Sequence, residues 1–106
     1  MIIPVHMFAF AKEGDRSKVR PVDIPADGDV TKIPEAQIED FLELTFIYGQ
    51  NEKQKISNMP SVSVGDIAQI NGRYFMVAPT GWIELSKEEF DNLTPPTSLS
   101  AYNKSI

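Results

Sequence analysis

The stretch DIAQINGRYFMV, residues 66–77, decides how this chain folds. It contains two short apolar runs separated by Asn71 and Gly72, and both residues tolerate the positive φ angles of a type I′ turn. The twist of that turn matches the twist of two antiparallel strands, so we predict a hairpin with a two-residue loop. The expected pairs are Ile70 with Arg73, Ala68 with Phe75 and Ile67 with Met76.

Both faces of this hairpin are at least partly apolar. One face carries Ala68, Ile70, Phe75 and Val77, and the other carries Ile67, Tyr74 and Met76. This pattern predicts a sheet that is buried on two sides, either as a barrel or as a sheet covered by a helix. A turn at residues 79–81 then leads into a third strand, WIEL, in which Trp82 is the largest apolar side chain.

The N-terminal part of the chain predicts a second hairpin. Apolar residues alternate along residues 2–10, and the alternation resumes in the segment VRPVDIP after the polar turn KEGDRSK. Pro21 has no backbone N–H to donate, so we expect this second strand at an edge of the sheet.

The pattern changes to a helical one between Pro34 and about Tyr48. Ile38, Phe41, Leu42 and Thr45 are spaced for one face of a helix. Proline at the first helical position and Gly49 just beyond the end are typical helix boundaries. The last residues, LTFIY, are also compatible with a strand, because they are rich in aromatic and β-branched types.

The C-terminal part predicts a short helix and a tail. Ser86 and Glu89 have the spacing of a capping box, and Pro95 and Pro96 stop the helix that it begins. We expect one domain over residues 1–96 and a flexible tail over residues 97–106. The predicted fold class is α+β: a small, mainly antiparallel sheet, barrel-like or open, with one main helix packed on it.

Composition excludes several classes of function. The chain of 106 residues has no cysteine, so thiol nucleophiles, disulfides and cysteine-bound zinc are excluded, and a reducing cytoplasm is the expected location. No apolar run approaches the roughly 20 residues that cross a membrane. The formal net charge of -5 counts against broad contact with a phosphate backbone.

Catalytic and metal-binding patterns are missing from the sequence. His6 is the only histidine and has no partner at metal-ligand spacing, so it is expected on a sheet face. Asp27 and Asp29 are expected in a solvated turn, since the other oxygen ligands of a calcium loop are missing. Gly65 and Asp66 lack the spacing of a phosphate-binding loop and are expected to form the turn into a strand. We therefore expect neither a metal nor a cofactor.

Two groups of charged residues are candidates for binding. Acidic residues gather on the predicted helix, and basic residues gather in the first hairpin. In most proteins such groups are simply solvated faces, and this alternative stays open for both. The acidic group is Glu35, Glu39, Asp40 and Glu43, and the basic group is Lys12, Arg16, Lys18 and Arg20.

The segment from Met59 to Leu85 resembles the YodL-like small domain of phage and mobile-element proteins. The resemblance covers the pattern S-x-SV-G-D, followed by an apolar-Tyr-apolar-Val strand and a Gly-Trp pair. It implies a phage or mobile-element setting and implies no reaction, so these motif residues are expected to be structural. The matching residues are Ser61, Ser63, Val64, Gly65, Asp66, Ile67, Tyr74, Phe75, Val77, Gly81 and Trp82.

The sequence thus favours a non-enzymatic accessory protein that binds a host-encoded or element-encoded protein through the acidic helix face. The alternative is a nucleic-acid-associated module in which the basic hairpin contacts phosphates. A hydrolase is a more distant alternative, because it would need Asp66, His6 or the paired acids to converge in one pocket.

Overall fold

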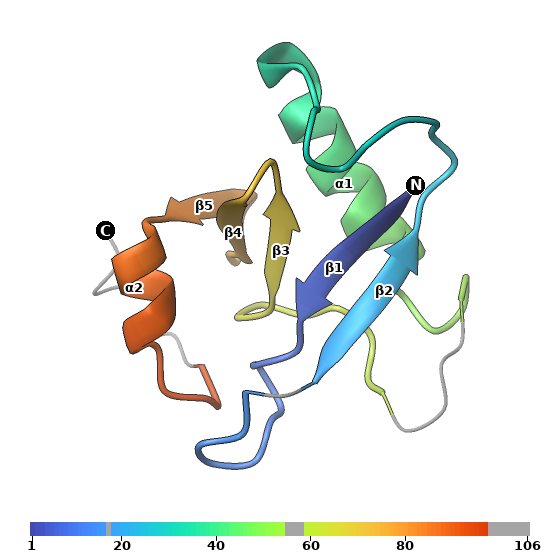
Figure 1. Cartoon of the computed structure of the whole chain (residues 1–106). Coiled ribbons are helices and arrows are strands. Elements are labelled where there is room, and N and C mark those ends of the chain that lie inside the picture. Colours follow the sequence, from blue (N-terminus) through green and yellow to red (C-terminus); the bar gives the residue numbers. More distant parts are fainter. Residues whose placement is uncertain (17, 55–58, 98–106) are drawn as a thin grey trace.

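The computed structural model describes residues 1–16, 18–54 and 59–97 of the chain (Figure 1). Five strands form one sheet in the order β2-β1-β3-β4-β5, and all neighbouring strands are antiparallel. A 3-10 turn and helix α1 lie between β2 and β3, and helix α2 follows β5. The strands are β1 (Ile2–His6), β2 (Val19–Asp23), β3 (Ile67–Ile70), β4 (Arg73–Val77) and β5 (Trp82–Leu85). The prediction of an α+β fold is confirmed.

The sheet is open, so the barrel alternative was wrong. Strands β2 and β5 form its two ends and do not pair with each other. Pro21 leaves a gap among the N–H donors of β2, which suits this strand to an edge as predicted. Helices cover both faces of the sheet, so its apolar side chains are buried without closure.

The β3–β4 hairpin has the predicted register. Ile70 pairs with Arg73, Ala68 with Phe75 and Ile67 with Met76. Asn71 and Gly72 have φ angles of 56° and 70°, as a type I′ turn requires. The hairpin therefore forms as its local sequence indicates.

The hairpin is buried on both faces, as predicted, and each face belongs to a separate core. Adjacent residues of a strand point to opposite faces, so Ile67 and Ala68 lie on opposite sides of β3. Ala68 belongs to the core that includes Ile38 and Leu42 of α1, and Ile67 belongs to the core that includes Phe90 of α2. The helices thus cover opposite faces, with α1 contacting β2 and β3 and α2 contacting β4 and β5 (Figure 1).

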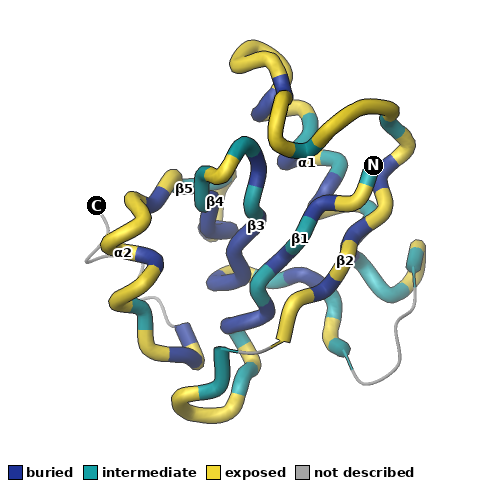
Figure 2. Tube along the Cα trace, viewed as in Figure 1, coloured by how far each residue is buried: buried dark blue, intermediate teal, exposed yellow. Residues whose placement is uncertain are grey.

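Helix α1 spans Ile38–Tyr48 and is preceded by a 3-10 turn over Glu35–Gln37. It buries Ile38, Leu42 and Thr45, three of the four residues expected on its inner face. The segment LTFIY is helical, because this face completes the core over the sheet. The outer face of the helix is exposed along most of its length (Figure 2).

The first hairpin and the C-terminal helix also agree with prediction in outline. Strand β1 ends at His6, four residues earlier than its alternation indicates, and Phe10 is 72% exposed. Helix α2 spans Lys87–Asn92, and Ser86 and Glu89 form the predicted capping box.

Thr97 was assigned to the flexible tail, but it is buried in the structure. Its amide donates to the carbonyl of Phe8 at 3.1 Å, and its hydroxyl donates to the carbonyl of Gly65 at 2.8 Å. The domain therefore extends at least to Thr97. The rest of the predicted tail, residues 98–106, lies outside the described residues.

Candidate functional site

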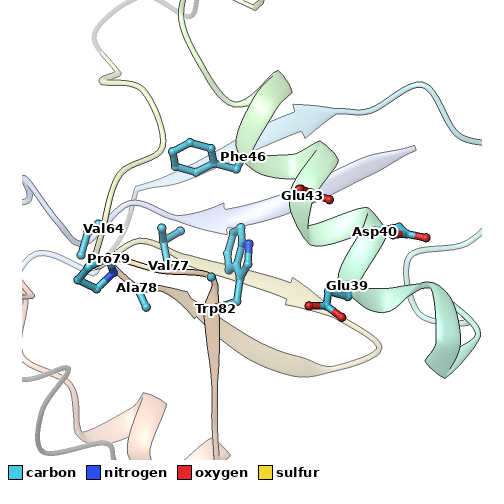
Figure 3. A pocket seen from close by; sticks show the side chains of 10 residues that line it. Glu39, Asp40, Glu43, Phe46, Val64, Val77, Ala78, Pro79 and Trp82 are labelled. Carbon is cyan, nitrogen blue, oxygen red and sulfur yellow. The ribbon is translucent and has the colours of Figure 1, made fainter.

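A pocket of about 420 Å³ lies between α1 and the turn that joins β4 to β5 (Figure 3). We call it the α1–β5 pocket. Its volume is within the usual range of ligand pockets, roughly 300 to 1,000 Å³. It is lined by Glu39, Asp40, Glu43, Phe46, Val64, Val77, Ala78, Pro79, Gly81 and Trp82. Three of the four predicted acidic residues thus lie at one place with four of the residues that carry the predicted motif.

One wall of the pocket comes from the outer face of α1. Positions 39, 43 and 46 recur at the spacing that places side chains on one side of a helix. The carboxylates of Glu39, Asp40 and Glu43 are exposed, and none has a hydrogen-bond or ion-pair partner among the residues that the structure describes. These three residues therefore give the wall an uncompensated negative charge.

The opposite wall is apolar and comes from the strands and their turn. Val77 and Trp82 are paired across β4 and β5, and the turn between them is held by a 3.0 Å bond from the amide of Ala78 to the carbonyl of Gly81. The indole of Trp82 stands between this turn and the helix, with Glu39 and Glu43 on the helix side (Figure 3). Phe46 and Val64 complete the apolar part and are 39% and 40% exposed.

Phe46 is a pocket residue that the sequence did not identify. It follows Glu39 by seven residues, so its position on the acidic face of α1 could have been read from the helical spacing. The segment around it was also compatible with a strand, and that ambiguity concealed its position.

Glu35 does not belong to the pocket, although it was grouped with the other acids. Its carboxylate pairs with the Arg73 guanidinium at 2.5 Å, and Arg73 also pairs with Glu84 at 2.7 Å. Hydrogen bonds from Arg73 lower the pKa of Glu84. Glu35 therefore helps to fix the 3-10 turn against the β3–β4 hairpin and β5.

The predicted motif residues before β3 have structural roles. The buried carboxylate of Asp66 accepts hydrogen bonds from the amides of Ala9 and Ser63 at 2.9 and 2.8 Å. Burial raises the pKa of Asp66 to about 6. Gly65 has a φ of 99°, and a Cβ added there would lie 2.2 Å from the Thr97 hydroxyl oxygen. The turn predicted at Gly65 and Asp66 thus also holds two distant segments together.

Asn71 does more than form the predicted turn. Its side-chain oxygen accepts from the amide of Ile33 and its NH₂ group donates to the carbonyl of Ile33, both at 2.7 Å. The amide of Asn71 donates to the carbonyl of Val30 at 2.9 Å. The loop before α1 is therefore bound to the hairpin, and the local sequence gave no sign of this contact.

His6 and Tyr74 lie in an aromatic cluster on the other face of the sheet. Tyr74 stacks on Phe90 with ring centroids 4.0 Å apart, and His6 meets the edge of Phe90 at 4.9 Å. His6 Nε2 lies 3.0 Å from the side-chain oxygen of Gln69, and burial lowers the pKa of His6. His6 is on a sheet face as predicted, and Tyr74 is covered by α2.

Two of the four basic residues of the first hairpin are occupied by internal contacts. Arg20 is fully buried, and its guanidinium donates to Asn51 and to the carbonyls of Pro60 and Gln54. Arg16 lies over the rings of Phe8 and Phe90 and donates to the carbonyls of Phe90 and Leu93. Lys12 and Lys18 are the exposed members of the group.

Within residues 1–16, 18–54 and 59–97, no group of three or more His, Asp or Glu side chains is arranged to hold a metal ion. None of the helices in these ranges has the length and apolar character needed to span a membrane.

Comparison with protein-family models, with curated proteins and with solved structures gives no match for this chain. The resemblance of residues 59–85 to the YodL-like domain therefore stays a prediction.

Proposed function

We propose that this chain is a non-enzymatic protein-binding module whose α1–β5 pocket recognises a basic segment of a partner protein. The observation that carries this proposal is the contrast within one pocket: its lining combines three acidic residues that have no partner in the described structure with partly exposed Phe46, Val64 and Trp82. Aromatic side chains in a concave surface are typical anchors of protein interfaces, and charged rims steer the partner toward them.

The acidic wall favours a positively charged partner. The chain itself carries a net charge of -5, so a basic protein surface would be attracted over a distance before contact. Such attraction is screened by salt, with a Debye length of about 8 Å at 0.15 M ionic strength. Binding that becomes slower as salt is added is therefore expected, with a smaller effect on dissociation.

The setting that we propose is a phage or mobile element, where the module would bind a protein of the host or of the element. Support for the setting is the resemblance of residues 59–85. The nucleic-acid alternative gains no support from the basic hairpin, because Arg16 and Arg20 are held by protein groups.

The test is a charge reversal of the pocket wall, with Glu39, Asp40 and Glu43 all changed to lysine. We expect the circular dichroism spectrum to be retained, because all three side chains are exposed, and the capture of protein partners from a cell extract to be lost. Captured proteins are identified by mass spectrometry and then tested one at a time with purified components.

The matched control reverses three exposed acids outside the pocket, Glu13, Asp27 and Glu52. Both triple variants have the same net charge, so a loss common to both would reflect overall charge. Retention of capture by the pocket variant at low salt would contradict the proposed function.

A further inference from the structure

We propose that the α1–β5 pocket accepts one lysine or arginine side chain of the partner, with its aliphatic stem against Trp82 and Phe46 and its cationic end toward the carboxylates of α1. This inference rests on the proposed protein-binding function and specifies what the pocket recognises.

The apolar part of the pocket suits the stem of a long basic side chain. Lysine and arginine bury their methylene groups against apolar surfaces while the charged end stays near water or an acid. Trp82 is partly exposed and stands in the pocket between the β4–β5 turn and α1 (Figure 3). A cation close to an indole face gains a further attraction from the ring electrons.

The charge in the pocket selects a cation and disfavours an anion. Glu39 and Glu43 are one helical turn apart, and Arg73, which neutralises Glu35 and Glu84, is not among the pocket residues. The acids of the pocket are not grouped as a metal site in the described part of the chain. An organic cation with an apolar stem satisfies both halves of the pocket, whereas a bare metal ion would leave Trp82 and Phe46 uncovered.

The pocket has the length for one such side chain and a small neighbouring group. The helical rise of 1.5 Å per residue places Glu39 and Phe46 about 10 Å apart along α1. The acids line the part of the pocket nearer the start of the helix, and Phe46 with Val64 lines the other end (Figure 3). A stem entering over Phe46 would therefore bring its charged end to Glu43 or Glu39.

The experiment uses the full chain and two capped tripeptides, acetyl-Val-Lys-Val-amide and acetyl-Val-Nle-Val-amide, in which norleucine keeps the stem and lacks the ammonium group. Trp82 is the only tryptophan of the chain, so its fluorescence reports occupancy of the pocket directly. We expect saturable quenching or a spectral shift with the lysine peptide. The norleucine peptide should bind about five- to tenfold more weakly, as expected for the loss of an exposed ion pair and a cation–π contact together.

Two variants separate the two halves of the pocket. Glu43→Gln should weaken the lysine peptide about threefold and leave the norleucine peptide unchanged, because only the ammonium group interacts with that carboxylate. Phe46→Ala should weaken both peptides by similar factors, since both have an apolar stem. Glu52→Gln serves as the control, because Glu52 is exposed and lies outside the pocket.

Equal affinity of the two peptides, or a preference for lysine that Glu43→Gln does not reduce, would overturn the inference. An unchanged Trp82 signal at saturating lysine peptide would also overturn it. These results would leave the proposed function standing if the triple charge reversal still abolished capture of a protein partner. Capture that survives the reversal would instead remove the proposed function itself.

Discussion

The two faces of the sheet are covered to different extents near β4 and β5. On one face, α2 places Phe90 against Tyr74 and His6, and the aromatic rings lie within stacking or edge distance of one another. On the other face, α1 covers β2 and β3, and the space beside Trp82 is the α1–β5 pocket. One face thus completes a core, and the other leaves an aromatic ring partly exposed beside three carboxylates that have no partner among the described residues.

The largest expected difference between the two faces is in the stability lost when one aromatic side chain on each face is truncated to alanine. Phe90→Ala should lower the free energy of unfolding by about 3 to 4 kcal/mol, because it leaves a cavity among aromatic rings. Trp82→Ala should cost only about 1 to 2 kcal/mol, since Trp82 is already partly exposed in the pocket. Urea unfolding followed by circular dichroism measures both values. Equal losses would show that the pocket side is as closed as the α2 side.

Asp66 provides a pH-dependent test at the entry to β3, next to the pocket residue Val64. The pKa of its buried carboxyl is raised to about 6 in the fold, from an ordinary value near 4, mainly by burial, which the Ala9 and Ser63 amides and the Arg20 charge partly oppose. Because its pKa is higher in the folded state than in the unfolded state, the Asp66 carboxyl makes its full contribution to stability below about pH 4, where it is protonated. That contribution is lost as the pH rises through about 6.

We therefore expect the stability advantage of the natural chain over Asp66→Asn to shrink by up to about 3 kcal/mol between pH 4 and pH 7. Urea unfolding of both proteins at a series of pH values measures this difference, which cancels most contributions of the other acids. A difference that stays constant with pH would show that Asp66 is equally charged in the folded and unfolded states.

The smallest effect is expected on the open face. Glu43→Lys removes a like-charge pair with Glu39 one helical turn away and creates an opposite-charge pair at the same spacing. The free energy of unfolding should rise by about 0.5 kcal/mol or less, as measured by thermal unfolding at low salt. A marked destabilisation would mean that Glu43 supports the fold, and the contrast between the two faces would then be weaker.

Much of the fold could be predicted, because the sequence patterns that specify it are local. The Asn71–Gly72 turn fixes the hairpin register, Ser86 and Glu89 fix the start of α2, and Pro21 indicates an edge strand. Each of these features depends on residues within a few positions of one another. The acidic face of α1 was also predicted from local spacing, and Glu39, Asp40 and Glu43 of that face line the pocket, which itself was not predicted.

The rest depends on contacts between distant segments, which no local pattern specifies. Glu35 is acidic like Glu39, Asp40 and Glu43, but it differs from them because it pairs with Arg73. That residue is 38 positions away in the sequence, so the pairing could not be read from a local pattern. Arg20 is buried by residues 51, 54 and 60, and Thr97 becomes part of the core through Phe8 and Gly65. Whether the sheet closes likewise depends on whether its edge strands, β2 and β5, pair with each other. The alternation of residues within each strand does not specify that pairing, so it could not exclude a barrel.

The double hydrogen bond between Asn71 and Ile33 has a consequence for cooperativity. Ile33 belongs to a segment without regular secondary structure, yet its amide is held by the turn of the hairpin. Amide hydrogen exchange at such a site requires an opening that breaks the bond. The Ile33 amide is therefore expected to exchange together with the β3–β4 hairpin, and replacing Asn71 by glycine would keep the turn while releasing the loop to exchange by itself.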